Sequence, residues 1–243
     1  MTYERLQPYD PTMIILSADT ATSVNSVAVC KDGQILAESV VTCGRTHAER
    51  LLDTVTWVLR EAGVALERVD ALAISKGPGS FTGLRVGVAT WKGLALGRGL
   101  PLVGVPTLAA LSRVPGPVAG LVCPVLDARM GEVFAAAYQV DSGLREQVLP
   151  DCVASIETVA EKLKGRRVTM FGDGVRAYRE RIAACLPGIR LLPETFWAPR
   201  ASAVGCEALE MLLAGCKADP AAVQPVYLRK SQAEQNREEA TGS

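Results

Sequence analysis

The stretch that decides the fold is KGPGSFTGLRVG at residues 76–87. An apolar run at 71–75 precedes it, and apolar residues at helical spacing follow it from Leu84 to about Leu96. A glycine-rich segment between a strand and a helix is a connection typical of α/β proteins, because the backbone has to turn there within a few residues. The stretch therefore predicts a strand, a tight turn and a helix in that order.

The glycines of this turn allow two interpretations. Glycine adopts backbone angles closed to other residues, and free N–H groups at a helix start favour an anion, so a phosphate could bind at Gly77, Gly79 and Ser80. The spacing, however, matches neither the P-loop nor the dinucleotide fingerprint. The alternative is a tight turn without a ligand, in which Ser80 or Thr82 caps the helix.

Strand and helix patterns alternate on both sides of the turn, which indicates an α/β fold. Asp32-Gly33 between two apolar runs predicts a hairpin. Thr46 with Glu49 predicts a capped helix that ends before Gly63. In the first half we expect three strands, a helix, a strand, a helix and a strand, over residues 13–17, 27–30, 34–41, 46–62, 71–75, 84–96 and 102–105.

The order of elements begins again after Pro115-Gly116-Pro117, which predicts a duplicated βββαβα unit. The elements expected in the second half are strands at 118–127, 133–139, 168–172 and 189–192 and helices at 155–163, 175–186 and 203–214. The predicted domains are a flexible extension at 1–12, a first lobe at 13–114, a second lobe at 115–230 and a polar tail at 231–243.

The composition excludes several classes of protein. The 26 basic and 26 acidic residues cancel, so the chain has no overall positive field with which to hold RNA tightly by itself. Seven cysteines without a CxxC pair are typical of reduced core thiols and not of a disulfide framework or a zinc ribbon. The first twelve residues are no secretory signal, and no run is long enough to span a membrane. These features predict a cytoplasmic protein.

The helix after the turn is dense in small residues. Gly83 and Gly87 lie four residues apart, as do Gly93 and Gly97, and small residues permit close approach of another backbone. This contact could lie within the domain, or it could be made with another subunit. In the second case Trp57 or Trp91 would be the aromatic anchors. The candidate partner interface then consists of Trp57, Gly83, Gly87, Trp91 and Gly93. Enlarging Gly87 or Gly93 to valine is then expected to block association without unfolding the chain.

Five segments of the chain resemble the TsaB (YeaZ) family. They are ILSADTATSVNSVAV at 15–29, THAERLL at 46–52, KGPGSFTGLRVGVATWKGLA at 76–95, DARMGEVFAAAY at 127–138 and PVYLRKSQAE at 225–234. The resemblance runs from Met13 to about Glu234. It implies an actin-like (ASKHA, ribonuclease H-like) fold of two lobes, related to the catalytic subunit TsaD.

The resemblance also implies a function. Members of this family pair with TsaD through the first lobe and its two helices, and the pair works with the ATPase TsaE. Together these proteins transfer a threonylcarbamoyl group from an adenylate made by TsaC to the adenosine next to the anticodon, in tRNAs that read codons beginning with A. The protein is accordingly expected to be a non-catalytic subunit without a cofactor, and to form a homodimer when it is isolated from TsaD.

Two features weaken the catalytic alternatives. His47 is the only histidine, whereas TsaD-type proteins hold a metal with two histidines four residues apart, and Glu49 is on the wrong side of the helix to replace the second one. Asp19-Thr20 and Asp127 stand where actin-like kinases organise metal and phosphates, but no glycine-rich phosphate loop follows Asp127. We therefore expect no metal site and a degenerate nucleotide cleft, and Asp19 could simply cap its own turn.

Three functions remain to be distinguished. The first is a scaffold that binds and activates TsaD. The second is an autonomous ATP-binding phosphotransferase of the actin and sugar-kinase superfamily. The third is a glycoprotease of the M22 type, which has little support because serine, histidine and aspartate do not cluster recognisably in the sequence.

Overall fold

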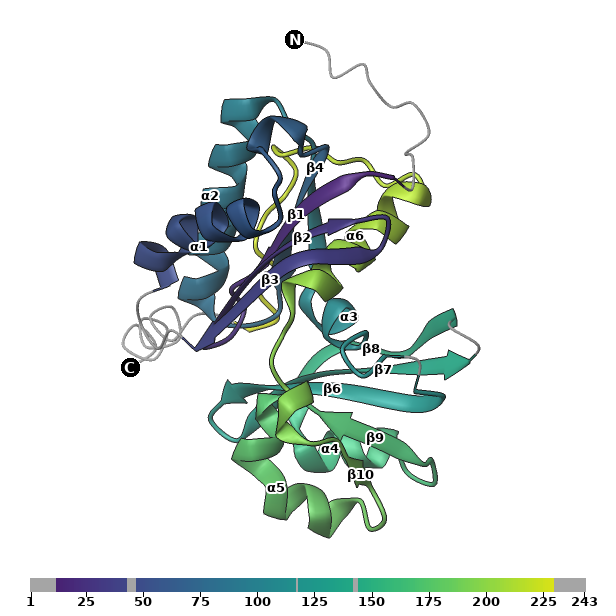
Figure 1. Ribbon diagram of the computed structural model, residues 1–243. Helices are drawn as coiled ribbons and strands as arrows, with labels where there is room; N and C mark the ends of the chain where they lie inside the picture. The colour runs from purple at the N-terminus through teal and green to yellow at the C-terminus, as the bar shows by residue number, and fades with distance from the viewer. Residues whose placement is uncertain (1–11, 43–46, 117, 142–143, 230–243) are drawn as a thin grey trace, which may run out of the picture.

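The computed structural model describes residues 12–42, 47–116, 118–141 and 144–229, without the side chains of 47–49 (Figure 1). Most of the expected extension at 1–12, the expected tail at 231–243 and the capping residue Thr46 lie outside these ranges. The described chain forms two lobes, each built on one five-stranded mixed sheet. The expected α/β class is confirmed.

The first lobe contains the first sheet, with the strand order β3-β2-β1-β4-β5. β1 is antiparallel to β2 and parallel to β4. The elements of this part of the chain are β1 (Ile14–Asp19), β2 (Val24–Lys31), β3 (Gln34–Thr42), α1 (His47–Glu61), η1 (Leu66–Arg68), β4 (Ala71–Gly77), α2 (Phe81–Arg98), β5 (Leu102–Pro106) and α3 (Thr107–Leu111).

The second sheet repeats this topology, since its order β10-β9-β6-β7-β8 is that of the first sheet written from the other edge. Its first strand, β6, is likewise antiparallel to the next strand and parallel to the fourth. The remaining elements are β6 (Gly120–Arg129), β7 (Glu132–Asp141), β8 (Leu144–Ser155), α4 (Ile156–Lys162), β9 (Val168–Phe171), α5 (Asp173–Cys185), β10 (Arg190–Leu191), η2 (Glu194–Phe196) and α6 (Ala201–Leu213). The predicted duplication of a βββαβα unit is confirmed.

Helices cover both faces of the first sheet. α1 and α2 pack on one face and on each other, with Leu51, Val88 and Trp91 in the shared core. α6 packs on the opposite face, where Val204 and Ala208 meet the inward residues of β1, β4 and β5. None of the described helices combines the length and the apolar character that crossing a bilayer requires.

The position of α6 corrects the predicted domain boundary. Helix α6 follows the second lobe in sequence and was assigned to it, but it returns to the first lobe (Figure 1). The apolar residues of α6, spaced four apart at Val204, Ala208 and Leu212, cover the face of the first sheet that α1 and α2 leave open. The first lobe is therefore discontinuous in sequence.

Several contacts join the lobes, among them the packing of Leu108 and Leu111 of α3 in the core of the second lobe. Arg145 of β8 and Arg113 both bind the half-buried carboxylate of Glu207 on α6, at 2.5 and 2.6 Å. After α6, the chain runs beside the glycine-rich turn and continues to Arg229, which pairs with Glu132 of the second lobe at 3.4 Å. Because charged groups shielded from water interact more strongly than exposed ones, the Glu207 cluster is a fixed junction between the lobes.

Candidate functional site

The glycine-rich run packs against the loop between β1 and β2. A Cβ atom at Gly79 would overlap the carbonyl oxygen of Ala21, and one at Gly83 would overlap that of Thr20. One at Gly87 would overlap the hydroxyl of Thr20. These glycines are thus required because two backbone segments touch, which is a structural reason for the run that needs no ligand.

Several N–H groups of the turn are already bonded within the chain. Ser80 donates its N–H to the carbonyl of Ala21 at 2.6 Å, and Gly77 donates to the hydroxyl of Thr107 at 3.1 Å. Ser80 is also the N-cap of α2, with its hydroxyl accepting from the Gly83 N–H. A phosphate would have to displace these bonds. The geometry therefore favours the interpretation of a capped packing turn and fits a nucleotide phosphate poorly.

Asp19 ends β1 and is buried at 1% exposure. Its Oδ1 accepts the N–H of Ala21 at 2.9 Å, as expected for a carboxylate that caps its own turn, while Oδ2 has no hydrogen-bond partner among the described residues. Burial raises the pKa of Asp19, the Ala21 N–H and the Ser75 side chain lower it, and the nearby Asp173 raises it, so that the net pKa is about 6. The carboxylate is therefore held in an environment that disfavours its charge.

Asp19→Asn is expected to change the pH dependence of folding. The pKa of Asp19 is higher in the folded than in the unfolded chain, so the folded state binds an extra proton between about pH 4 and pH 6 and the free energy of unfolding falls as the pH rises through this window. The loss at neutral pH is about 2 to 3 kcal/mol. The variant keeps the acceptor for Ala21 and lacks this loss. Urea unfolding at several pH values from acid to neutral measures the free energy of unfolding of the wild type and the variant. If the two plots of this free energy against pH were parallel, Asp19 would not be the cause of the pH dependence.

Asp127 takes the matching place in the second lobe. Its Oδ1 accepts the N–H of Arg129 at 2.8 Å, just as Asp19 accepts that of Ala21. The same oxygen accepts the hydroxyl of Tyr178 at 3.1 Å, and Oδ2 pairs with the guanidinium of Arg129 at 3.1 Å. Both aspartates thus serve the turns that follow their own strands, once in each repeat.

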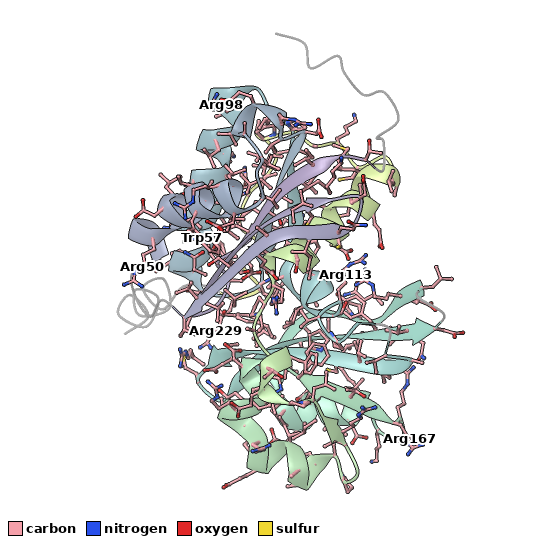
Figure 2. All side chains as sticks on the ribbon, in the orientation of Figure 1. Arg50, Trp57, Arg98, Arg113, Arg167 and Arg229 are labelled. Carbon is pink, nitrogen blue, oxygen red and sulfur yellow. The ribbon has the colours of Figure 1, made fainter. Side chains whose placement is uncertain are left out.

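The outer face of α1 and α2 is where the structure differs most from the expected interface. Trp57 is 43% exposed and Leu52 52% exposed on α1, and Leu96 is 64% exposed on α2. On α2, Ala89 and Gly93 are exposed too, and a Cβ atom at Gly93 would meet nothing within 4 Å. We call these five residues the α1–α2 face. Trp57 lies on α1 (Figure 2), and α1 packs on α2.

Three residues of the expected interface do not belong to this face. Gly83 and Gly87 are buried against the loop at Thr20, and Trp91 is fully buried with its indole N–H near the carbonyl of Leu16, at 3.5 Å. The prediction that these three contact a partner is wrong, because they point into the core of the first lobe. Gly87→Val is accordingly expected to disturb the fold and not an interface.

The prediction that a metal site is absent concerns His47, whose side chain lies outside the described part of the chain. α1 begins at His47, and the side chain of Glu49 lies outside that part as well. Among the residues that are described, no group of three or more histidine, cysteine, aspartate or glutamate side chains is arranged to hold a metal ion. The expectation that the metal site is absent stays a prediction based on the single histidine.

Sequence reasoning missed Leu52 and Leu96. For Leu96 a signal was present, since it lies off the buried stripe of α2, which runs through Leu84, Val88, Trp91 and Ala95. Leu52 gave no such signal, because it precedes the buried Val55 and Leu59 by three and seven residues and its spacing predicts burial. A large apolar residue off such a stripe points to a surface that another molecule covers.

Comparison with known proteins places the chain among tRNA-modification proteins. The family model "TsaD: tRNA N6-adenosine threonylcarbamoyltransferase" matches residues 39–237. The tRNA threonylcarbamoyladenosine biosynthesis protein TsaB of Escherichia coli K12 is 37% identical over 225 residues, which cover 90% of this chain and 96% of that protein.

Solved structures agree with the sequence comparison. YeaZ from Pseudomonas aeruginosa is similar with a TM-score of 0.79 and 32% identity, over 89% of this chain and all of that one. The ethanolamine utilization protein EutJ from Carboxydothermus hydrogenoformans shares the fold at a TM-score of 0.50 and 14% identity, over 84% of this chain and 93% of that one. Together with the duplicated sheets, these likenesses show the actin-like fold.

Proposed function

The chain belongs to the TsaB family of tRNA threonylcarbamoyladenosine biosynthesis proteins, and from this premise we propose that it is the subunit that binds and activates the transferase TsaD. In this role it works with the ATPase TsaE and meets tRNA through the assembled complex. The modified base is the adenosine next to the anticodon in tRNAs that read codons beginning with A.

The observation that carries the proposal is the α1–α2 face. It comprises three exposed large apolar side chains, Leu52, Trp57 and Leu96, and two small exposed residues of α2, Ala89 and Gly93. Small residues let a partner helix approach closely, and a tryptophan beside them gives the contact an aromatic anchor. Such a surface suits a helical partner and does not suit a small polar substrate.

Two features support a subunit whose work is binding. The single histidine cannot form the pair with which TsaD-type proteins hold a metal. The glycine-rich run, which in a phosphotransferase would face phosphate groups, uses Gly79 and Gly83 to pack against the β1–β2 loop. We propose that the actin-like framework serves here to present the α1–α2 face.

The same face accounts for an expected homodimer. Without TsaD its apolar side chains remain exposed, and a second copy of the chain offers the same surface in return. TsaD and a second copy would therefore compete for the α1–α2 face.

Reconstituted tRNA modification tests the proposed function. The purified chain alone is expected to modify no tRNA, whereas adding it to TsaD, TsaE and the adenylate-forming enzyme should restore threonylcarbamoylation of an unmodified transcript. Modification that proceeds equally well without the chain would contradict the proposal. Turnover of Mg-ATP by the isolated chain would favour a phosphotransferase, and stoichiometric bound zinc or iron would favour a metalloenzyme.

A further inference from the structure

A cluster of basic residues lies at one end of the second lobe. The sequence KLKGRR at 162–167 brings four cations together with no acidic residue between them, and Arg190 stands beside them in the fold. All of these cations are exposed. We define the basic patch by its five members, which are Lys162, Lys164, Arg166, Arg167 and Arg190.

The fold explains why Arg190 joins the run. Arg167 immediately precedes β9, and Arg190 opens the neighbouring strand β10, where it pairs with Thr169. β9 and β10 are parallel, so both arginines lie at the same end of the second sheet. Two segments more than twenty residues apart in sequence therefore place their positive charges together.

The patch differs from two other cations of the same lobe, which pair with carboxylates. Arg181 pairs with Glu157 and Arg176 pairs with Glu194, at 2.6 and 2.9 Å. In the patch only Lys164 has such a partner, Glu161, at 3.3 Å; within the described ranges the other four have no carboxylate within 4.0 Å. The patch is therefore a local excess of positive charge on a chain whose net charge is zero.

A purely structural role explains only part of the patch. Lys162 and Lys164 stand at the C-terminal end of α4, where cations interact favourably with the helix dipole. Arg166, Arg167 and Arg190 lie beyond that last turn and make no such contact. The helix dipole therefore gives no structural reason for these three arginines.

The place of the patch leaves it free when the α1–α2 face is covered. Figure 2 shows Arg167 at the outer edge of the second lobe, whereas Trp57 lies on α1 of the first lobe, on the other side of the view. Arg229, which joins the lobes, lies on the other side of the second lobe from Arg167. A partner docked on α1 and α2 would therefore leave the patch open to a further ligand.

We propose that the basic patch binds the phosphate backbone of the tRNA that the complex modifies. Closely spaced arginines and lysines without carboxylate partners are suited to a polyanion, because each phosphate contact releases condensed counterions. The inference rests on the proposed function, which supplies the RNA. The patch adds affinity that no base sequence specifies, and it is too small to hold RNA tightly without the rest of the complex.

The test compares two double charge reversals in the complex with TsaD. Arg166→Glu/Arg167→Glu removes the centre of the patch, and Arg68→Glu/Arg179→Glu is the matched control, because Arg68 and Arg179 are also exposed and have no carboxylate partner among the described residues. Fluorescence anisotropy with a labelled unmodified tRNA transcript, at several salt concentrations, gives the Kd. The patch variant should bind about tenfold more weakly, and its slope of log K against log salt should be shallower by about 1.5. The control should bind like the wild type.

Three results would overturn the inference. The first is that the patch variant and the wild type have the same tRNA affinity and the same salt slope. The second is that the patch variant and the control variant lose the same amount of tRNA affinity. The third is that the patch variant keeps its tRNA affinity but supports less modification, which would assign the patch to the binding of an acidic protein. Co-elution with TsaD and equal melting temperatures are checked first. If the wild-type chain does not co-elute with TsaD, the proposed function is contradicted independently of the patch. The same tRNA titration of the isolated wild-type and variant chains at low salt then tests whether the patch binds tRNA.

Discussion

Gly83→Ala is expected to lower the free energy of unfolding by about 2 to 3 kcal/mol, whereas Gly93→Ala should raise it by up to about 1 kcal/mol. Both glycines lie in α2 and both substitutions add one methyl group. At Gly83 the new Cβ would overlap the carbonyl oxygen of Thr20, which belongs to the backbone and cannot move aside as a flexible side chain does. At Gly93 the space is open, and alanine favours the helix.

Urea unfolding of the two variants and the wild type at one pH measures this difference. Equal slopes of free energy against urea concentration show that the unfolded states are comparable. Similar stabilities for the two variants would contradict the packing role assigned to the glycine-rich run. They would also reopen the possibility that its glycines are needed for a bound phosphate.

Trp57→Ala is expected to weaken association with TsaD by about 2 kcal/mol or more, which is about thirtyfold in Kd. Trp57 is 43% exposed on α1 and contributes the largest side chain of the α1–α2 face. Phe196→Ala is the matched control, because Phe196 is an aromatic residue of similar exposure, 39%, in the 3-10 helix η2.

Surface plasmon resonance with immobilised TsaD gives both affinities. The control should bind as the wild type does, and both variants should keep the wild-type melting temperature because neither side chain is buried. A loss of similar size in both variants, or none in either, would place the contact elsewhere on the chain.

The order of elements could be predicted from the sequence because the hydrophobic periods are clear and the unit occurs twice. β8 was not predicted, since it is an edge strand whose residues are almost all exposed or half-buried, among them Leu144 at 79%, and its pattern lacks the alternation of apolar and polar residues. The partner of α6 was not predictable either, because an apolar stripe indicates burial and does not indicate which sheet buries it.

The candidate site was predicted in part. The sequence singled out α2 and Trp57, but it could not separate Gly83 from Gly93, since the difference lies in a contact with Thr20, which is 63 residues away along the chain from Gly83. Trp91 could have been excluded, because it follows Leu84 and Val88 at helical spacing and so belongs to the buried stripe.

The central claim, that the exposed α1–α2 face binds TsaD, is tested most directly by calorimetric titration of TsaD with the wild-type chain and with Gly93→Val. The added side chain has room in the isolated chain but would hold a partner helix away. We predict saturable one-to-one binding for the wild type and no measurable binding for Gly93→Val at an unchanged melting temperature. Binding of Gly93→Val with the wild-type Kd would contradict the claim.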